Sequence, residues 1–97
     1  MIEYLYDCIR ATATDDTPIL AKITNNSGEC ITDTCMLTVF DDEYTVIVSV
    51  PGGLMDDVWH FVIPKEATMN LRGRYFYCIS NHESGERYCF GKPIYFT

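Results

Sequence analysis

Short runs of aromatic and β-branched residues, each closed by a turn cluster, fill the last third of the chain. These runs are Trp59–Pro64, Gly73–Ile79, Tyr88–Phe90 and Pro93–Phe96. Aromatic and β-branched side chains favour extended backbone, whereas Gly, Pro, Asn and Asp favour turns. The pattern therefore predicts strands of an all-β domain.

In the first two thirds of the chain, apolar and polar residues alternate, which is the two-residue period of a β-strand. Ile19, Ala21 and Ile23 fall on one side of an extended segment, with polar residues between them. Pro51-Gly52-Gly53 predicts a break, because Pro donates no hydrogen bond to a sheet. The strands that we expect are Tyr4–Ala13, Pro18–Thr24, Thr34–Phe40, Tyr44–Val50 (with Tyr44, Val46, Val48 and Val50 on one face), Asp57–Ile63, Arg74–Ser80, Glu86–Phe90 and Pro93–Thr97.

The strand spacing predicts a single all-β domain over residues 1–97. About seven or eight mainly antiparallel strands at intervals of roughly 8–12 residues are typical of a sandwich or a small barrel. Lys65–Leu71 is the one segment with helical character, and it is long enough for a turn or two. In or near the core we expect Leu37, Trp59, Phe61, Ile63, Phe76 and Ile79.

The chain is acidic, with 14 Asp and Glu against 7 Lys and Arg and a formal net charge of −7. That charge repels phosphate backbones and anionic membranes, so we expect no direct nucleic-acid partner and no membrane partner. The acidic residues gather at Asp15-Asp16, at Asp41, Asp42 and Glu43, and at Asp56 and Asp57. All three groups lie in predicted turns, so Asp residues that build turns are the favoured interpretation, and an acidic face that docks on a basic protein groove is the alternative.

Five cysteines occur, Cys8, Cys30, Cys35, Cys78 and Cys89, and none forms a CxxC pair. We expect free thiols in a reducing compartment, although Cys78 and Cys89 flank a predicted turn and could face each other there. His60 and His82 are distant from the cysteines in sequence, so we predict no metal site and no cofactor.

No motif in the sequence indicates an enzyme. His82 stands beside Glu83 and Ser84, but three neighbours in one exposed turn rarely converge on a pocket. Gly52-Gly53 lacks the helix and the Lys of a phosphate loop and is interpreted as a turn. We therefore predict a protein without catalytic residues.

Tyrosine is abundant, with 7 Tyr, 5 Phe and 1 Trp making up 13% of the chain. The two-residue period puts Tyr75 and Tyr77 on one face, with Phe76 opposite. The rings either build the core or form a protein interface, where Tyr is enriched. The candidate interface residues are Tyr75, Tyr77, Tyr88 and Tyr95.

Several segments resemble a known family. They are Asp16–Thr24, the turn Asn25–Gly28 with Cys30–Thr32, Val58–Thr68, Leu71–Tyr75 and Lys92–Phe96. Their order is similar to that of the immunoglobulin-like N-terminal domains of phage baseplate upper proteins, and to small virion-associated phage proteins. The turn departs from the family, since it reads Asn26-Ser27-Gly28 where an acidic turn is usual. The resemblance implies an immunoglobulin-like β-sandwich of about seven or eight mainly antiparallel strands, a structural role and no active site.

Two functions follow as expectations. The first is a phage structural or accessory protein that acts by protein–protein contact with a virion component or with itself, as a possible homo-oligomer. It would be made in the host cytoplasm and become part of the virion. The second is a small acidic inhibitor of a bacterial defence system, which would occupy a basic protein groove with Asp41, Asp42, Glu43, Asp56 and Asp57.

Overall fold

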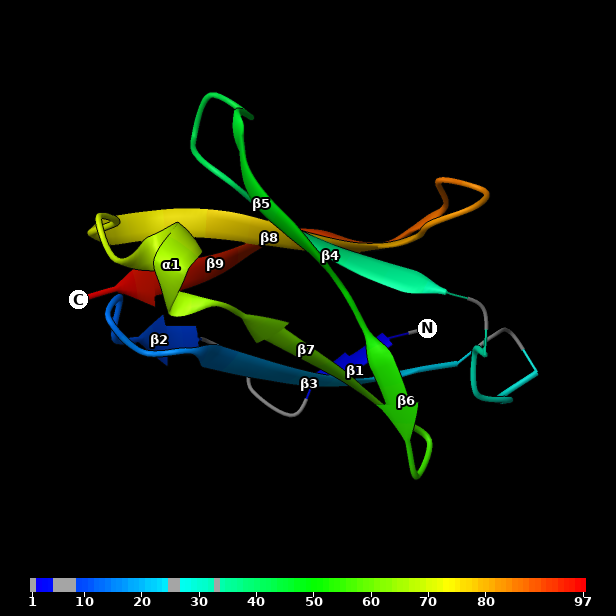
Figure 1. Ribbon diagram of the computed structural model, residues 1–97. Helices are drawn as coiled ribbons and strands as arrows, with labels where there is room; N and C mark the ends of the chain where they lie inside the picture. Colours follow the sequence, from blue (N-terminus) through cyan, green and yellow to red (C-terminus); the bar gives the residue numbers. More distant parts are fainter. Residues whose placement is uncertain (1, 5–8, 25–26, 33) are drawn as a thin grey trace.

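The computed structural model describes residues 2–4, 9–24, 27–32 and 34–97, and the side chains of residues 11–24, 27–32, 34–88 and 91–97. Within these ranges the chain forms two β-sheets that face each other, with one short helix at an end (Figure 1). The all-β prediction is confirmed.

One sheet has four antiparallel strands in the order β1-β3-β7-β6. These strands are β1 (Ile2–Tyr4), β3 (Thr17–Ile23), β7 (Val58–Ile63) and β6 (Gly53–Met55). Inward and outward side chains alternate along β3 and β7, as the period of the sequence predicts.

The other sheet has five strands in the order β2-β9-β8-β4-β5. These strands are β2 (Ile9–Ala11), β9 (Arg87–Phe96), β8 (Gly73–Asn81), β4 (Cys35–Phe40) and β5 (Val46–Pro51). Of the strand pairs that the described residues form in this sheet, β2–β9 is parallel and the others are antiparallel. Together the pairings β3-β7-β6 and β9-β8-β4 give the strand order of an immunoglobulin-like sandwich, so the predicted fold class is confirmed.

The break predicted at Pro51-Gly52-Gly53 falls at Gly52, between β5 and β6, but Gly52-Gly53 does not form the turn that was predicted. The chain stays extended there and passes from β5 in one sheet to β6 in the other (Figure 1). The Gly52 amide donates a hydrogen bond to the Cys35 carbonyl at 2.9 Å. A Cβ on Gly52 would lie 2.6 Å from Phe61 Cε1, so glycine allows the chain to cross over the core.

Residues 87–96 form one strand rather than the two that were predicted. Gly91 has a φ of +76°, and the β8–β9 register shifts between Tyr77 and Ile79, which marks a bulge rather than an end. In the described part of the chain, β2 pairs with β9 at Ile94, Tyr95 and Phe96, so Pro93 lies outside this pairing, where a missing amide hydrogen is tolerated.

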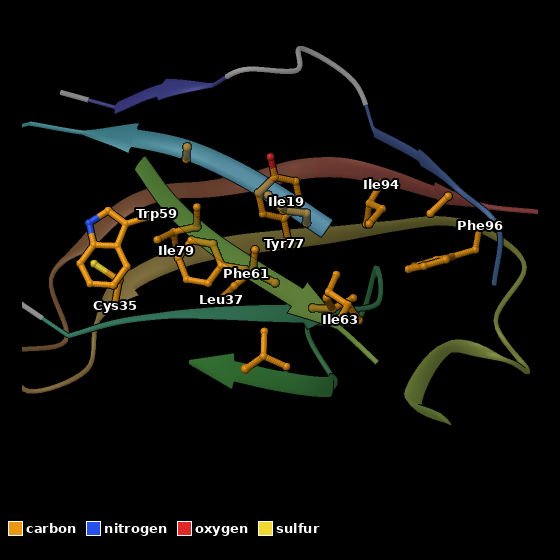
Figure 2. Close-up of a cluster of buried hydrophobic side chains, with 14 of the residues drawn as sticks. Ile19, Cys35, Leu37, Trp59, Phe61, Ile63, Tyr77, Ile79, Ile94 and Phe96 are labelled. Atoms are coloured by element: carbon orange, nitrogen blue, oxygen red, sulfur yellow. The ribbon is translucent and has the colours of Figure 1, made fainter. Parts of the chain in front are cut away.

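The core lies between the two sheets and holds five of the six residues predicted for it (Figure 2). Trp59 stacks on Phe61 with ring centroids 6.3 Å apart, and its indole Nε1 donates a hydrogen bond to the Ile31 carbonyl at 2.9 Å. Phe76 is the exception, because its ring lies on the outer side of β8. The core residues are Ala11, Ala13, Ile19, Ala21, Ile23, Cys35, Leu37, Val39, Val50, Trp59, Phe61, Ile63, Tyr77, Ile79, Ile94 and Phe96.

The helix α1 (Lys65–Thr68) is shorter than the predicted segment and lies at the end of the sandwich near the C-terminus (Figure 1). The Thr68 hydroxyl is buried and donates to the Ala13 carbonyl at 2.7 Å. The Lys65 amide donates to the Asp16 carboxylate at 2.8 Å. These bonds join α1 to the turn before β3.

Candidate functional site

The outer face of the five-stranded sheet carries a cluster of aromatic side chains. Along β4 and β8 the residues alternate, so that Val39 and Tyr77 point into the core while Phe40 and Phe76, which pair with each other, point outward. We call the outward set the aromatic face; its residues are Phe40, Tyr44, Val46, Arg74, Phe76 and Tyr95.

The rings of the aromatic face cover one another. Phe40 stacks on Tyr44 at 5.7 Å and on Phe76 at 6.1 Å between centroids. Phe40 is only 4% exposed although it points away from the core, because its neighbours shield it. Tyr44 ends the stack and is 69% exposed. The Arg74 guanidinium carbon lies 5.2 Å from the centroid of the Phe76 ring.

The turn between β4 and β5 holds Tyr44 over Phe40. One carboxylate oxygen of Asp41 accepts hydrogen bonds from the amides of Glu43 and Thr45, both at 2.9 Å. The Asp41 amide donates to the Thr45 carbonyl, and the Tyr44 amide donates to the Asp41 carbonyl, each at 3.1 Å. Tyr44 then has a φ of 63°, in the left-handed region. Asp41 therefore builds this turn. This agrees with the interpretation that the acidic residues serve to form turns.

A bulge in β5 divides the residues that were predicted to share a face. Val39 pairs with Val48, but Phe40 pairs with Val46, so Ile47 is the extra residue. Val46 consequently joins the aromatic face and is 60% exposed, whereas Val48 and Val50 turn toward the core.

Two grooves flank Tyr44 on this face. The smaller, of about 330 Å³, is lined by Phe40, Asp41, Asp42, Tyr44, Phe76 and Gly91. The larger, of about 480 Å³, is lined by Thr38, Phe40, Tyr44, Val46, Cys78, Ser80, Gly85 and Arg87. Phe40 and Tyr44 thus lie between the two grooves. The smaller groove has the carboxylates of Asp41 and Asp42 on its wall, and the larger groove has the guanidinium of Arg87.

The predicted interface tyrosines lie mostly on the inner side. Tyr77 is 2% exposed in the core, so its prediction as an interface residue is wrong. Tyr75 packs edge-on against Phe96 at 5.8 Å, and the Tyr88 hydroxyl accepts a hydrogen bond from the Asn81 amide at 3.3 Å. Tyr95 is half-buried and alternates with the buried Ile94 and Phe96, so it belongs to the outer side.

The two acidic turns lie far apart. Asp41, Asp42 and Glu43 precede β5, at the edge of the aromatic face. Asp56 and Asp57 follow β6 and form the turn to β7, with φ values of 51° and 64°. In Figure 1 these turns are at opposite ends of the continuous β5–β6 segment. A single groove on a partner protein would have to span the whole β5–β6 segment to contact both turns.

Among the described side chains, Cys30, Cys35 and Cys78 are thiols that take part in no disulfide, as predicted. Cys78 lies on the outer side of β8, and burial raises the pKa of its thiol, an effect that Arg87 and Thr38 partly offset. In the register of β8 and β9, Cys89 stands opposite Ile79, not opposite Cys78. Cys8 and the side chain of Cys89 lie outside the described residues.

The structure does not bring the two histidines together. His60 is on β7 in the four-stranded sheet, and His82 is in the β8–β9 turn, where its amide donates to the Thr34 carbonyl at 2.8 Å. The neighbouring Ser84 hydroxyl accepts a hydrogen bond from the Glu86 amide at 3.2 Å. Among the described residues, no group of three or more His, Cys, Asp or Glu side chains is placed to hold a metal ion.

In the described ranges, no helix has the length and apolar character needed to cross a membrane. Comparison with known proteins finds no family model that matches the chain and no curated protein that is significantly similar to it.

Proposed function

We propose that this protein is a non-enzymatic binding module that attaches to a protein partner through the aromatic face. The observation that carries the proposal is the exposure of Tyr44 and Val46 on top of a stack of rings. Apolar side chains gathered at the surface are typical of interaction sites, and Tyr and Arg are enriched at interface cores. Arg74, Phe76 and Tyr95 extend the same surface.

A phage virion component is the partner class that we propose, either a baseplate or head–tail protein or a second copy of this chain. The resemblance of Asp16–Thr24, Val58–Thr68 and Lys92–Phe96 to phage baseplate domains supports this choice. An immunoglobulin-like sandwich suits the role, because its sheet faces are rigid platforms for side chains.

Incorporation into particles tests the proposal. Virions released by cells that encode the chain would be purified on a density gradient, and the chain would be quantified by mass spectrometry. We expect it to copurify with the capsid proteins. The double variant Tyr44→Ser, Val46→Ser should be lost from the particles while remaining folded, because both side chains are exposed in the free protein.

The four-stranded sheet supplies the matched control. Met55 and Val62 are 59% and 52% exposed on its outer face, so Met55→Ser, Val62→Ser removes a similar apolar area elsewhere. Particles that retain this control and lose the first variant would support the aromatic face as the attachment site. Particles that lack the wild-type chain would contradict a virion role.

The second candidate function is inhibition of a bacterial defence protein with a basic groove. It is favoured by the position of Asp41 and Asp42 on the wall of the smaller groove. Binding dominated by these carboxylates should weaken steeply as salt is raised, whereas binding through the rings should change little. The salt dependence of a measured complex therefore distinguishes the two functions.

A further inference from the structure

We infer that the smaller groove beside Tyr44 receives a cationic side chain of the protein partner, arginine above all. This inference rests on the proposed function and specifies the chemistry of the partner at one point of the aromatic face. It is carried by the rings of the groove, by its carboxylates and by the contrast with the larger groove.

Among the residues whose side chains are described, three aromatic rings line the smaller groove. Phe40, Tyr44 and Phe76 are stacked with interplanar angles of 24–25°, so their faces and edges form one continuous aromatic wall. Aromatic faces attract cations, and the planar guanidinium of arginine also stacks on them. The chain itself contains such a contact, because the Arg74 guanidinium lies over the Phe76 ring.

The carboxylates of the groove are available to a cation. Asp41 uses one oxygen for the amides of Glu43 and Thr45. Within the described residues, the Asp42 side chain makes no hydrogen bond and no ion pair, and it lies on the same wall as the rings. A guanidinium placed there would contact rings and carboxylate together, and each contact is stronger when the other excludes water.

The larger groove shows that this preference is local. It shares Phe40 and Tyr44 with the smaller one, but Arg87 is on its wall and its described lining has no Asp or Glu. A cation is thus favoured on one side of Tyr44 and disfavoured on the other. The net charge of −7 further attracts a basic partner to the whole molecule.

Nuclear magnetic resonance tests the inference on the full chain. The labelled protein would be titrated with the tripeptide acetyl-Gly-Arg-Gly-amide and with the same peptide carrying citrulline, which keeps the shape of arginine without its charge. We expect saturable, millimolar shifts of the Asp42, Tyr44 and Phe76 amides, with the arginine peptide binding about tenfold more tightly. Equal affinity for the two peptides, or shifts elsewhere on the protein only, would overturn the inference.

Two variants with the same change in charge sharpen the test. Asp42→Asn removes the Asp42 carboxylate from the groove, whereas Asp15→Asn removes an exposed carboxylate from the turn before β3. The first should weaken binding of the arginine peptide several-fold, and the second should leave it unchanged. Particle incorporation that is lost in Tyr44→Ser, Val46→Ser but retained in Asp42→Asn would overturn this inference while supporting the proposed function.

Discussion

The inner and outer faces of the five-stranded sheet are built from the same strands and use similar side chains, yet they are covered in different ways. On the inner face, Tyr77 and Phe96 are buried by the opposite sheet. On the outer face, Tyr44 and Phe76 lie against Phe40 and shield its ring from water. The inner rings are covered on every side, and the outer stack ends in an exposed tyrosine.

The difference shows what each ring cluster contributes. Burial between two sheets gives an aromatic side chain its full hydrophobic stabilisation. A stack at the surface gives less, since its last ring still contacts water. Substitutions on the two faces should therefore affect folding and binding differently.

The largest effect is expected from Phe61→Ala, which removes a ring of β7 from the core between the two sheets. Phe61 is fully buried, stacks on Trp59 and lies next to Gly52, so its loss leaves a cavity. The free energy of unfolding, measured with urea, should fall by about 3–5 kcal/mol. Val62 is the next residue of β7 and lies on the outer face of the four-stranded sheet. Val62→Ala should therefore change the free energy of unfolding by about 0.5 kcal/mol or less. Similar losses for both would contradict the assignment of the core.

The next largest effect is expected from Gly52→Ala, which adds a methyl group to the packed core between the two sheets. In Gly52→Ala the new Cβ would meet Phe61 Cε1 at 2.6 Å and Trp59 Cε3 at 2.8 Å. Because both rings are packed, we expect a loss of about 1–3 kcal/mol in thermal or urea unfolding. Gly53→Ala is the control, since nothing lies within 4 Å of its Cβ. A neutral Gly52→Ala would mean that the crossover between the sheets is looser than described.

Phe76→Ala tests the outer stack. It removes the contacts with Phe40 and Arg74, and we expect a loss of about 1 kcal/mol, well below that of Phe61→Ala. The same variant should abolish binding of the arginine tripeptide. If Phe76→Ala destabilised the protein as much as Phe61→Ala, the outer rings would be a second core rather than a binding surface.

The smallest effect concerns the Cys78 thiol on the outer side. Burial raises its pKa above the ordinary value of 9.0, so the folded state holds the proton more tightly than the unfolded state. Stability from this group is complete below pH 9.0 and is lost as the pH rises through the higher pKa of the folded state. Urea titrations from about pH 8 to about pH 10 should thus show a smaller alkaline loss in Cys78→Ala than in the wild type. An unchanged pH profile would contradict this burial effect.

The sequence predicted the fold wherever one side of a strand was clearly apolar. Ile19, Ala21 and Ile23 were assigned correctly, and so were Trp59, Phe61 and Ile63. Glycine was the main source of error. At Gly52 it permits a close approach to Phe61, and at Gly91 it permits a bulge, but in the sequence both positions are typical of turns.

The candidate site was predicted only in part. The two-residue period correctly predicted that Tyr77 and Phe76 lie on opposite faces of β8. Because both faces carry rings, however, the period alone does not tell which face lies in the core. Tyr44 was assigned to a strand because it continues the alternation of β5. Its position depends on the Asp41 turn and on the bulge at Ile47, which no periodic pattern encodes.

The passage of β5 into β6 has a consequence for aggregation. These two strands are the free edges of the two sheets on one side of the molecule, and they are consecutive in the chain. A foreign strand that added to this side would find 6 residues of β5 or 3 residues of β6 before the template changed sheet. Short edge strands and an edge proline both disfavour strand addition, so the crossover at Gly52, together with Pro51, should make this side of the protein a poor template.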